Sequence, residues 1–215
     1  LKIVKFLMLF LMLSLSINSS AQLFGSTTNI IESEVYNYNE RNSHVIDVNG
    51  DGLNDIVSLS IGNIVWYENL DNGNFETRKI IYTPISNNNY VTDIIVFDID
   101  SDGDSDIVSG INYGNINIHR NDGFGNFILE VLTGSNFYDV NLLAFDDVDG
   151  DLDLDIVYLN SNELWWIENT DGFITQQEQI IGTGFVQNKS IAIGDIDNDL
   201  DNDILVSYGG AIYFV

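Results

Sequence analysis

The sequence predicts an all-β protein with the fold of a β-propeller, in which about four blades are visible within the 215 residues. An Asp-rich loop occurs four times, at 47–55, 98–106, 147–155 and 195–203, so the first Asp of successive loops is 51, 49 and 48 residues further on. Short segments rich in Ile and Val, separated by Gly, Asn and Asp turns, follow each loop and are typical of β-strands. A four-stranded unit repeated at this period indicates a propeller blade.

The first repeat shows the elements expected in every blade. The strand after the loop covers 56–61, and the next covers 64–69 before the turn DNGNF. A further apolar segment lies at 78–82, and the strand 91–97 leads into the second loop. Equivalent segments in the later repeats are 116–121, 156–159, 164–169 and 178–181.

The two ends of the repeat array leave one strand to be accounted for. The fourth repeat reaches Val215 inside the strand equivalent to 64–67, and its fourth strand does not follow. Residues 24–31 (FGSTTNII) are similar to 75–81 (FETRKII), so we expect them to supply the outer strand of the last blade and to cover its edge. The chain begins with Leu and stops within the pattern, which favours a partial propeller of a longer protein over a complete four-bladed ring.

The N-terminus predicts a signal peptide at 1–21. Lys2 and Lys5 precede an apolar run, and Ser19-Ser20-Ala21 offers small residues for cleavage before Gln22. The run is shorter than the ~20 residues that a membrane-spanning helix needs, and a buried N-terminal helix is the alternative. We therefore expect the propeller repeats to occupy 22–215, a secreted or cell-surface location, and no transmembrane segment after cleavage.

Composition restricts the partners of the chain. Its net charge of −26 would repel nucleic acid, so we expect no nucleic-acid partner. The absence of cysteine excludes disulfides, thiolate zinc sites and a Cys nucleophile. The loops hold 18 of the 33 acidic residues, so the negative charge is concentrated where divalent cations could bind.

Each loop places candidate oxygen ligands at alternate positions 1, 3, 5, 7 and 9, and Leu53 at position 7 would use its backbone carbonyl. The candidates are Asp47, Asn49, Asp51, Leu53 and Asp55; Asp98, Asp100, Asp102, Asp104 and Asp106; Asp147, Asp149, Asp151, Asp153 and Asp155; and Asp195, Asp197, Asp199, Asp201 and Asp203. Calcium prefers six to eight hard oxygens, whereas magnesium resists losing its waters and zinc or copper would require more His or Cys. The loops therefore predict about four Ca²⁺ ions; solvated Asx turns are the alternative.

Position 6 divides the loops into two pairs. Gly52 and Gly103 suit a sharp turn there, but Leu152 and Leu200 leave the geometry of the third and fourth loops open. An EF-hand is excluded because no helices flank the loops and position 12 lacks the required Glu.

These loops, of the type DxDxDGDxDIV and followed by WYEN and GNF segments, resemble the FG-GAP/VCBS repeat family, whose repeats form integrin-α-like propeller blades. The resemblance covers about 42–215 and is closer to bacterial VCBS repeats, because no literal FG…GAP string is present. It implies that the calcium loop joins the first two strands of a blade, with the loops on one face and ligands often on the other.

No residue pattern indicates catalysis, so we expect no enzyme activity. His44 and His119 belong to no recurring motif with a nucleophile, and Trp66, Trp165 and Trp166 lie on strands, where packing between blades is favoured over stacking on sugars. The leading hypothesis is an extracellular binding or adhesion module for a protein or glycan ligand. The alternatives are the propeller portion of a larger secreted polysaccharide-degrading enzyme and a structural spacer.

Overall fold

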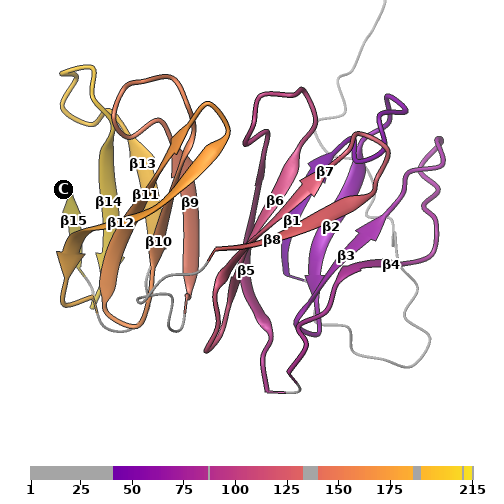
Figure 1. The fold of residues 1–215 in the computed structure, drawn as a ribbon, viewed down its shortest axis with the longest axis horizontal. Coiled ribbons are helices and arrows are strands. Elements are labelled where there is room, and N and C mark those ends of the chain that lie inside the picture. The colour runs from indigo at the N-terminus through magenta and orange to yellow at the C-terminus, as the bar shows by residue number, and fades with distance from the viewer. Residues whose placement is uncertain (1–40, 87, 133–139, 186–189, 210, 215) are drawn as a thin grey trace, which may run out of the picture. The chain divides into compact units, whose positions relative to one another are not determined.

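The computed structural model describes residues 41–86, 88–132, 140–185, 190–209 and 211–214 (Figure 1). All regular elements in these residues are β-strands. Among them no helix is present that could cross a membrane. The expected signal peptide and the expected outer strand at 24–31 lie outside the described residues.

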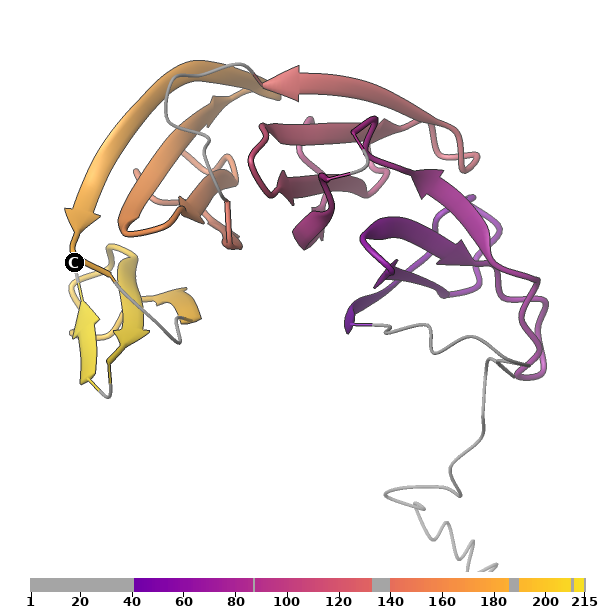
Figure 2. The same cartoon turned by 90° about the horizontal axis from the view of Figure 1, so that it is seen from below.

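In the described residues four antiparallel sheets are arranged as blades of a β-propeller, which confirms the predicted all-β propeller fold (Figures 1 and 2). Blade 1 consists of β1 (Arg41–Ile46), β2 (Asp55–Ser60), β3 (Asn63–Tyr67) and β4 (Lys79–Tyr82). Blade 2 consists of β5 (Val91–Phe97), β6 (Asp106–Ile111), β7 (Ile116–Asn121) and β8 (Phe127–Leu132). Blade 3 consists of β9 (Leu142–Asp146), β10 (Asp155–Leu159), β11 (Glu163–Thr170) and β12 (Phe173–Thr183). Blade 4 consists of β13 (Ser190–Gly194), β14 (Asp203–Tyr208) and β15 (Ala211–Phe214).

Strand register repeats from blade to blade. Val57 pairs with Trp66 in blade 1, and Val157 pairs with Trp166 in blade 3. The predicted segment 178–181 is part of a much longer strand, β12. Its hairpin turns tightly through Asp171 and Gly172, which both have positive φ, 50° and 76°, so the strand continues almost from the turn.

The apolar core lies between neighbouring sheets. Trp66 and Val57 of blade 1 pack with Val96 and Ile107 of blade 2 in one cluster. Corresponding clusters join blade 2 to blade 3 and blade 3 to blade 4. Trp66 and Trp165 are buried, and Trp166 packs half-buried against the third cluster, so all three indoles serve packing as expected.

Antiparallel topology separates the connections into two groups. The Asp-rich loops join β1 to β2, β5 to β6, β9 to β10 and β13 to β14, the first two strands of each blade. The turns β3–β4, β7–β8 and β11–β12 lie at the same end of their blades. The turns after β2, β6 and β10 lie at the other end, as the family resemblance implied.

The two histidines make structural contacts. His119 is buried in β7, where Nε2 lies 2.9 Å from Oγ of Ser109 and the ring lies 4.8 Å from that of Tyr82. Burial lowers the His119 pKa to about 4, so the ring is neutral at physiological pH. Nε2 of His44 lies 3.2 Å from the backbone oxygen of Ile94.

Candidate metal centres

The first Asp of each loop shapes the backbone around itself; loops 1 to 4 denote 47–55, 98–106, 147–155 and 195–203. In loop 1, Asp47 accepts the N–H groups of Gly50, Asp51 and Gly52 at 2.9, 3.2 and 2.8 Å. The same role belongs to Asp98 with Asp102 and Gly103, to Asp147 with Gly150 and Leu152, and to Asp195 with Asn198, Asp199 and Leu200. The chain therefore wraps around the first carboxylate.

Position 6 has the same backbone conformation in all four loops. Gly52 and Gly103 have φ of 86° and 100°, and Leu152 and Leu200 have φ of 80° and 81°. The two leucines are 88% and 91% exposed, so their side chains leave the loop interior. The geometry left open by the sequence is thus common to both pairs of loops.

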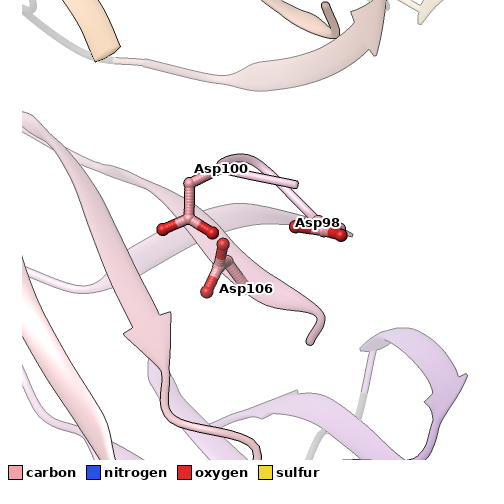
Figure 3. A group of neighbouring side chains, drawn as sticks. All are labelled: Asp98, Asp100 and Asp106. Atoms are coloured by element: carbon pink, nitrogen blue, oxygen red, sulfur yellow. The ribbon is translucent and has the colours of Figure 1, made fainter. Parts of the chain in front are cut away.

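Three loops bring acidic side chains together. The groups are Asp98, Asp100 and Asp106; Asp147, Asp149 and Asp151; and Asp195, Asp197 and Asp199, and in each group one oxygen per residue lies within 4.8 Å of the others. Figure 3 shows the carboxylates of Asp100 and Asp106 next to each other, with that of Asp98 to one side. The other candidates, Asp102, Asp104, Asp153, Asp155, Asp201 and Asp203, lie in the loops but outside these groups. Loop 1, which has Asn49 at position 3, is not among the groups found in the described residues.

The donor set fits a calcium-sized cation. Oxygens that share one Ca²⁺ at roughly 2.4 Å can be no more than about 4.8 Å apart, which the three groups satisfy. In loop 2, Oδ1 of Asp100 is buried and accepts no hydrogen bond from the described residues. A buried carboxylate oxygen without a donor is costly, and a cation bound between Asp98, Asp100 and Asp106 would satisfy it.

Side chains at position 7 contact the next turn of their own blade. Oδ2 of Asp153 accepts the N–H of Asp171 at 2.5 Å. Asp104 lies against Gly123, where an added Cβ would come within 2.3 Å of Oδ2. The side chains at position 7 of loops 2 and 3 therefore face the turn between the third and fourth strands of their blade.

The last Asp of loops 1, 2 and 3 is a buried acceptor of backbone N–H groups. Asp55, Asp106 and Asp155 are at most 1% exposed. In each case Oδ2 accepts the N–H of loop position 2, and Oδ1 accepts the N–H of an Asn at or just beyond the end of the third strand of the same blade. The donor pairs are Val48 and Asn69, Ile99 and Asn121, and Val148 and Asn169, at 2.7–3.2 Å. Sequence reasoning overlooked these Asn residues, although WYEN, IHRN and WIEN repeat them.

Burial also changes the protonation of these carboxylates. It raises the pKa of Asp106 and of Asp155 to about 6, and it raises that of Asp55, although the donated N–H groups partly offset the shift. The Trp66 indole N–H approaches Asp55 closely enough to favour the charged form, without a hydrogen bond of normal geometry. A bound cation would favour the ionised forms of all three.

Charges beside position 3 differ among the loops. In loop 2, Arg120 donates to Oδ2 of Asp100 at 2.8 Å and to the backbone oxygen of Gly172 in blade 3 at 3.0 Å. In loop 1, Asn49 donates to Glu68 at 3.0 Å, and Glu68 forms an ion pair with Lys79. In loop 3, burial raises the pKa of Asp149, followed by the charge of Asp151, and the Glu168 carboxylate adds to the shift.

Fold and loops together define a propeller of repeated blades, each with an Asp-rich loop between its first two strands. The chain belongs to the FG-GAP-like repeat family, because that family's model matches residues 47–109 and 147–206, more than half of the sequence. This confirms the resemblance seen in the sequence. No curated protein sequence matches the chain.

Solved structures share the fold at low identity. A lectin from Agrocybe aegerita that recognises non-reducing terminal N-acetylglucosamine is 19% identical, with a TM-score of 0.56 over 80% of this chain and 51% of the lectin. The Photorhabdus luminescens Tc holotoxin pore is 18% identical, with a TM-score of 0.50 over 80% of this chain and 9% of the toxin chain. The chain thus spans about half the length of the lectin.

Proposed function

We propose that this chain is a secreted, calcium-binding β-propeller module that binds an extracellular ligand, with a glycan favoured over a protein, and has no catalytic activity of its own. Calcium holds the loop end of each blade, and the ligand binds at the opposite end. The proposal rests on the chemical difference between the loop end of the blades and the opposite end.

The loop end carries the acidic groups described above, whereas the turns at the opposite end of blades 1 and 2 contain no charged residue. The turns 61–62 and 112–115 and the described residues of 83–90 contain no charged side chain. These segments contain several Asn residues and three exposed apolar or aromatic side chains, those of Ile61, Tyr90 and Tyr113. Aromatic faces and amide groups are suited to a neutral sugar, which offers apolar C–H faces and hydroxyl groups.

Backbone strain supports a role for this end. Ile61 and Tyr113 occupy equivalent turns with φ of 50°, and they are 60% and 72% exposed. Positive φ is unfavourable for both residues, above all for a β-branched one, and strain of this kind concentrates at binding sites. The fold shared with a lectin adds weight to a glycan as the ligand.

A glycan array probed with the chain, with calcium and with excess chelator, tests the ligand. We expect binding to neutral glycans that falls at least tenfold for Tyr113→Ala. Phe124→Ala is the matched control, because Phe124 is an exposed aromatic residue in the β7–β8 turn at the loop end. Equal losses for the two variants would contradict a ligand site at the uncharged end.

Thermal melting with calcium and with chelator tests the cation. Binding to the folded form alone stabilises by about 1.8 kcal/mol per site at roughly 2 mM calcium and a Kd of about 0.1 mM, or about 7 kcal/mol for four sites. We expect calcium, and magnesium to a smaller degree, to raise the melting temperature. An unchanged melting temperature would identify the loops as ordinary acidic turns.

A further inference from the structure

Asn121 connects two neighbouring loops through hydrogen bonds. Its backbone N–H donates to Oδ1 of Asp106, in loop 2, at 2.7 Å. Its side-chain Nδ2 donates to the backbone oxygen of Val48, in loop 1, at 2.8 Å. The N–H of Val48 in turn donates to Oδ2 of Asp55 at 3.1 Å. The last carboxylates of loops 1 and 2 are therefore joined through two residues, Asn121 and Val48.

Asn169 makes the same connection one blade further on. Its N–H donates to Oδ1 of Asp155 at 2.8 Å, and its Nδ2 donates to the backbone oxygen of Ile99 at 3.0 Å. The N–H of Ile99 donates to Oδ2 of Asp106 at 3.2 Å. The two connections share Asp106, so a series of hydrogen bonds linked through the intervening residues, here called the Asn relay, runs from Asp55 through Asp106 to Asp155.

The Asn relay is shielded from water. Asn121 and Asn169 are 6% and 2% exposed, and the linking residues Val48 and Ile99 are buried. A buried hydrogen bond is stronger than one in water. Water therefore does not compete for these hydrogen bonds.

We propose that Asn121 and Asn169 are positioning residues that couple the loops, so that cation binding in one loop strengthens cation binding in its neighbour. This inference rests on the proposed binding of divalent cations. Asp106 belongs both to the acidic group of loop 2 and to the relay. An ion that orders Asp106 also orders Asn121, which holds the Val48 peptide and, through it, the Asp55 carboxylate of loop 1.

The first and last blades supply internal contrasts. Asn69, the equivalent residue of blade 1, also donates its N–H to the last Asp of its loop, but its Nδ2 donates to Asn54 in the same loop at 2.9 Å. The contact of blade 4 with blade 3 is made differently, by Nδ2 of Asn202 with Oδ1 of Asp146 and the backbone oxygen of Asp147. Asn69→Ala is therefore a matched control that alters a loop contact without cutting a connection between loops.

Terbium(III) luminescence gives a readout for loop 1 alone. Terbium replaces calcium at oxygen sites and emits when a nearby indole is excited, and Trp66 lies beside Asp55. The part of the emission that disappears in Trp66→Phe reports loop 1. Asp100→Ala removes a carboxylate from the acidic group of loop 2 without removing a member of the Asn relay.

With Asn121 present, we expect Asp100→Ala to raise the terbium concentration that half-saturates loop 1 by about fivefold. That shift should persist in the Asn69→Ala chain and vanish in the Asn121→Ala chain. If Asn121→Ala does not fold, Asn121→Leu replaces it, since it has a similar size but has no hydrogen-bond donor in its side chain. A shift that survives the loss of Asn121 would identify charge acting through space and overturn the relay.

The failure of coupling is distinguishable from the failure of binding. Loop 1 emission whose midpoint is unaffected by Asp100→Ala would overturn the coupling and leave the proposed function standing. The absence of any emission sensitised by Trp66 would overturn both for this loop.

Discussion

Loop 2 and loop 4 contain the same hydrogen bond between their second and last residues. The N–H of Ile99 donates to Asp106 at 3.2 Å, and the N–H of Ile196 donates to Asp203 at 2.9 Å. Yet Ile99 is 1% exposed and Ile196 is 46% exposed. The loop conformation is therefore local, whereas its burial depends on something outside the loop.

The following blade supplies that burial. Asn169 of blade 3 donates to Ile99, and Gly172 lies so close to Asp100 that an added Cβ would be 2.5 Å from the Asp100 Cβ. Among the described residues, loop 4 has no contact of this kind. The conformation of each loop is thus set within its own blade, whereas the burial of the loop comes from the blade that follows.

The largest expected effect comes from removing the last Asp of each loop. Asp106→Ala would leave the buried N–H groups of Ile99 and Asn121 without an acceptor, at a cost of about 3 kcal/mol in the free energy of unfolding. Asp203→Ala frees the N–H of Ile196, which water can reach, so about 1 kcal/mol is expected.

Urea unfolding in chelator measures both variants without a contribution from bound cation. Equal costs for Asp106→Ala and Asp203→Ala would show that the blade after loop 2 adds nothing to this interaction.

The loops and the strands could be predicted from the sequence because the patterns that indicate them are local. The strands predicted at 91–97 and 116–121 match β5 and β7 residue for residue. β2 begins at Asp55 rather than 56, because Asp55 already pairs with Ile46 across the blade. The family resemblance, rather than the pattern itself, placed each loop between the first two strands of a blade, where the structure has it.

The contacts between blades could not be predicted from the sequence. Asn121 bonds to a backbone oxygen 73 residues away, and a backbone acceptor carries no residue type that a pattern could reveal. Arg120 likewise meets Asp100 and Gly172 only after blades 2 and 3 pack together. An Asn recurs at the same position of the first three repeats, but the backbone oxygen to which its side chain donates depends on tertiary structure.

Charge is the second difference between loops 2 and 4. Arg120 neutralises part of loop 2, whereas no ion pair among the described residues involves loop 4. Removing a positive charge next to a cation site favours cation binding, so Arg120→Gln should raise the calcium affinity of loop 2 about tenfold.

Calorimetric titration of Arg120→Gln should show its largest gain in affinity at one site, with smaller gains at the loops that the Asn relay couples to it. Arg78→Gln is the control, because Arg78 donates to Ser60 at the opposite end of blade 1. A similar gain in both variants would indicate a general effect of net charge rather than the Asp100 contact.

The smallest expected effect concerns position 6, where the two loops share a backbone conformation but differ in residue. Leu200 has φ of 81° and is 91% exposed, so Leu200→Gly relieves left-handed strain and removes almost no packing. The extra freedom of glycine in the unfolded chain offsets part of that gain, which leaves a stabilisation of about 0.5 kcal/mol. At Gly103, with φ of 100°, an added Cβ would meet nothing within 4 Å, so Gly103→Leu should cost about 1 kcal/mol through the backbone alone. Urea unfolding of both variants with calcium present measures the pair. Shifts in the same direction would mean that the residue at position 6 acts through the covering blade and not through its own φ.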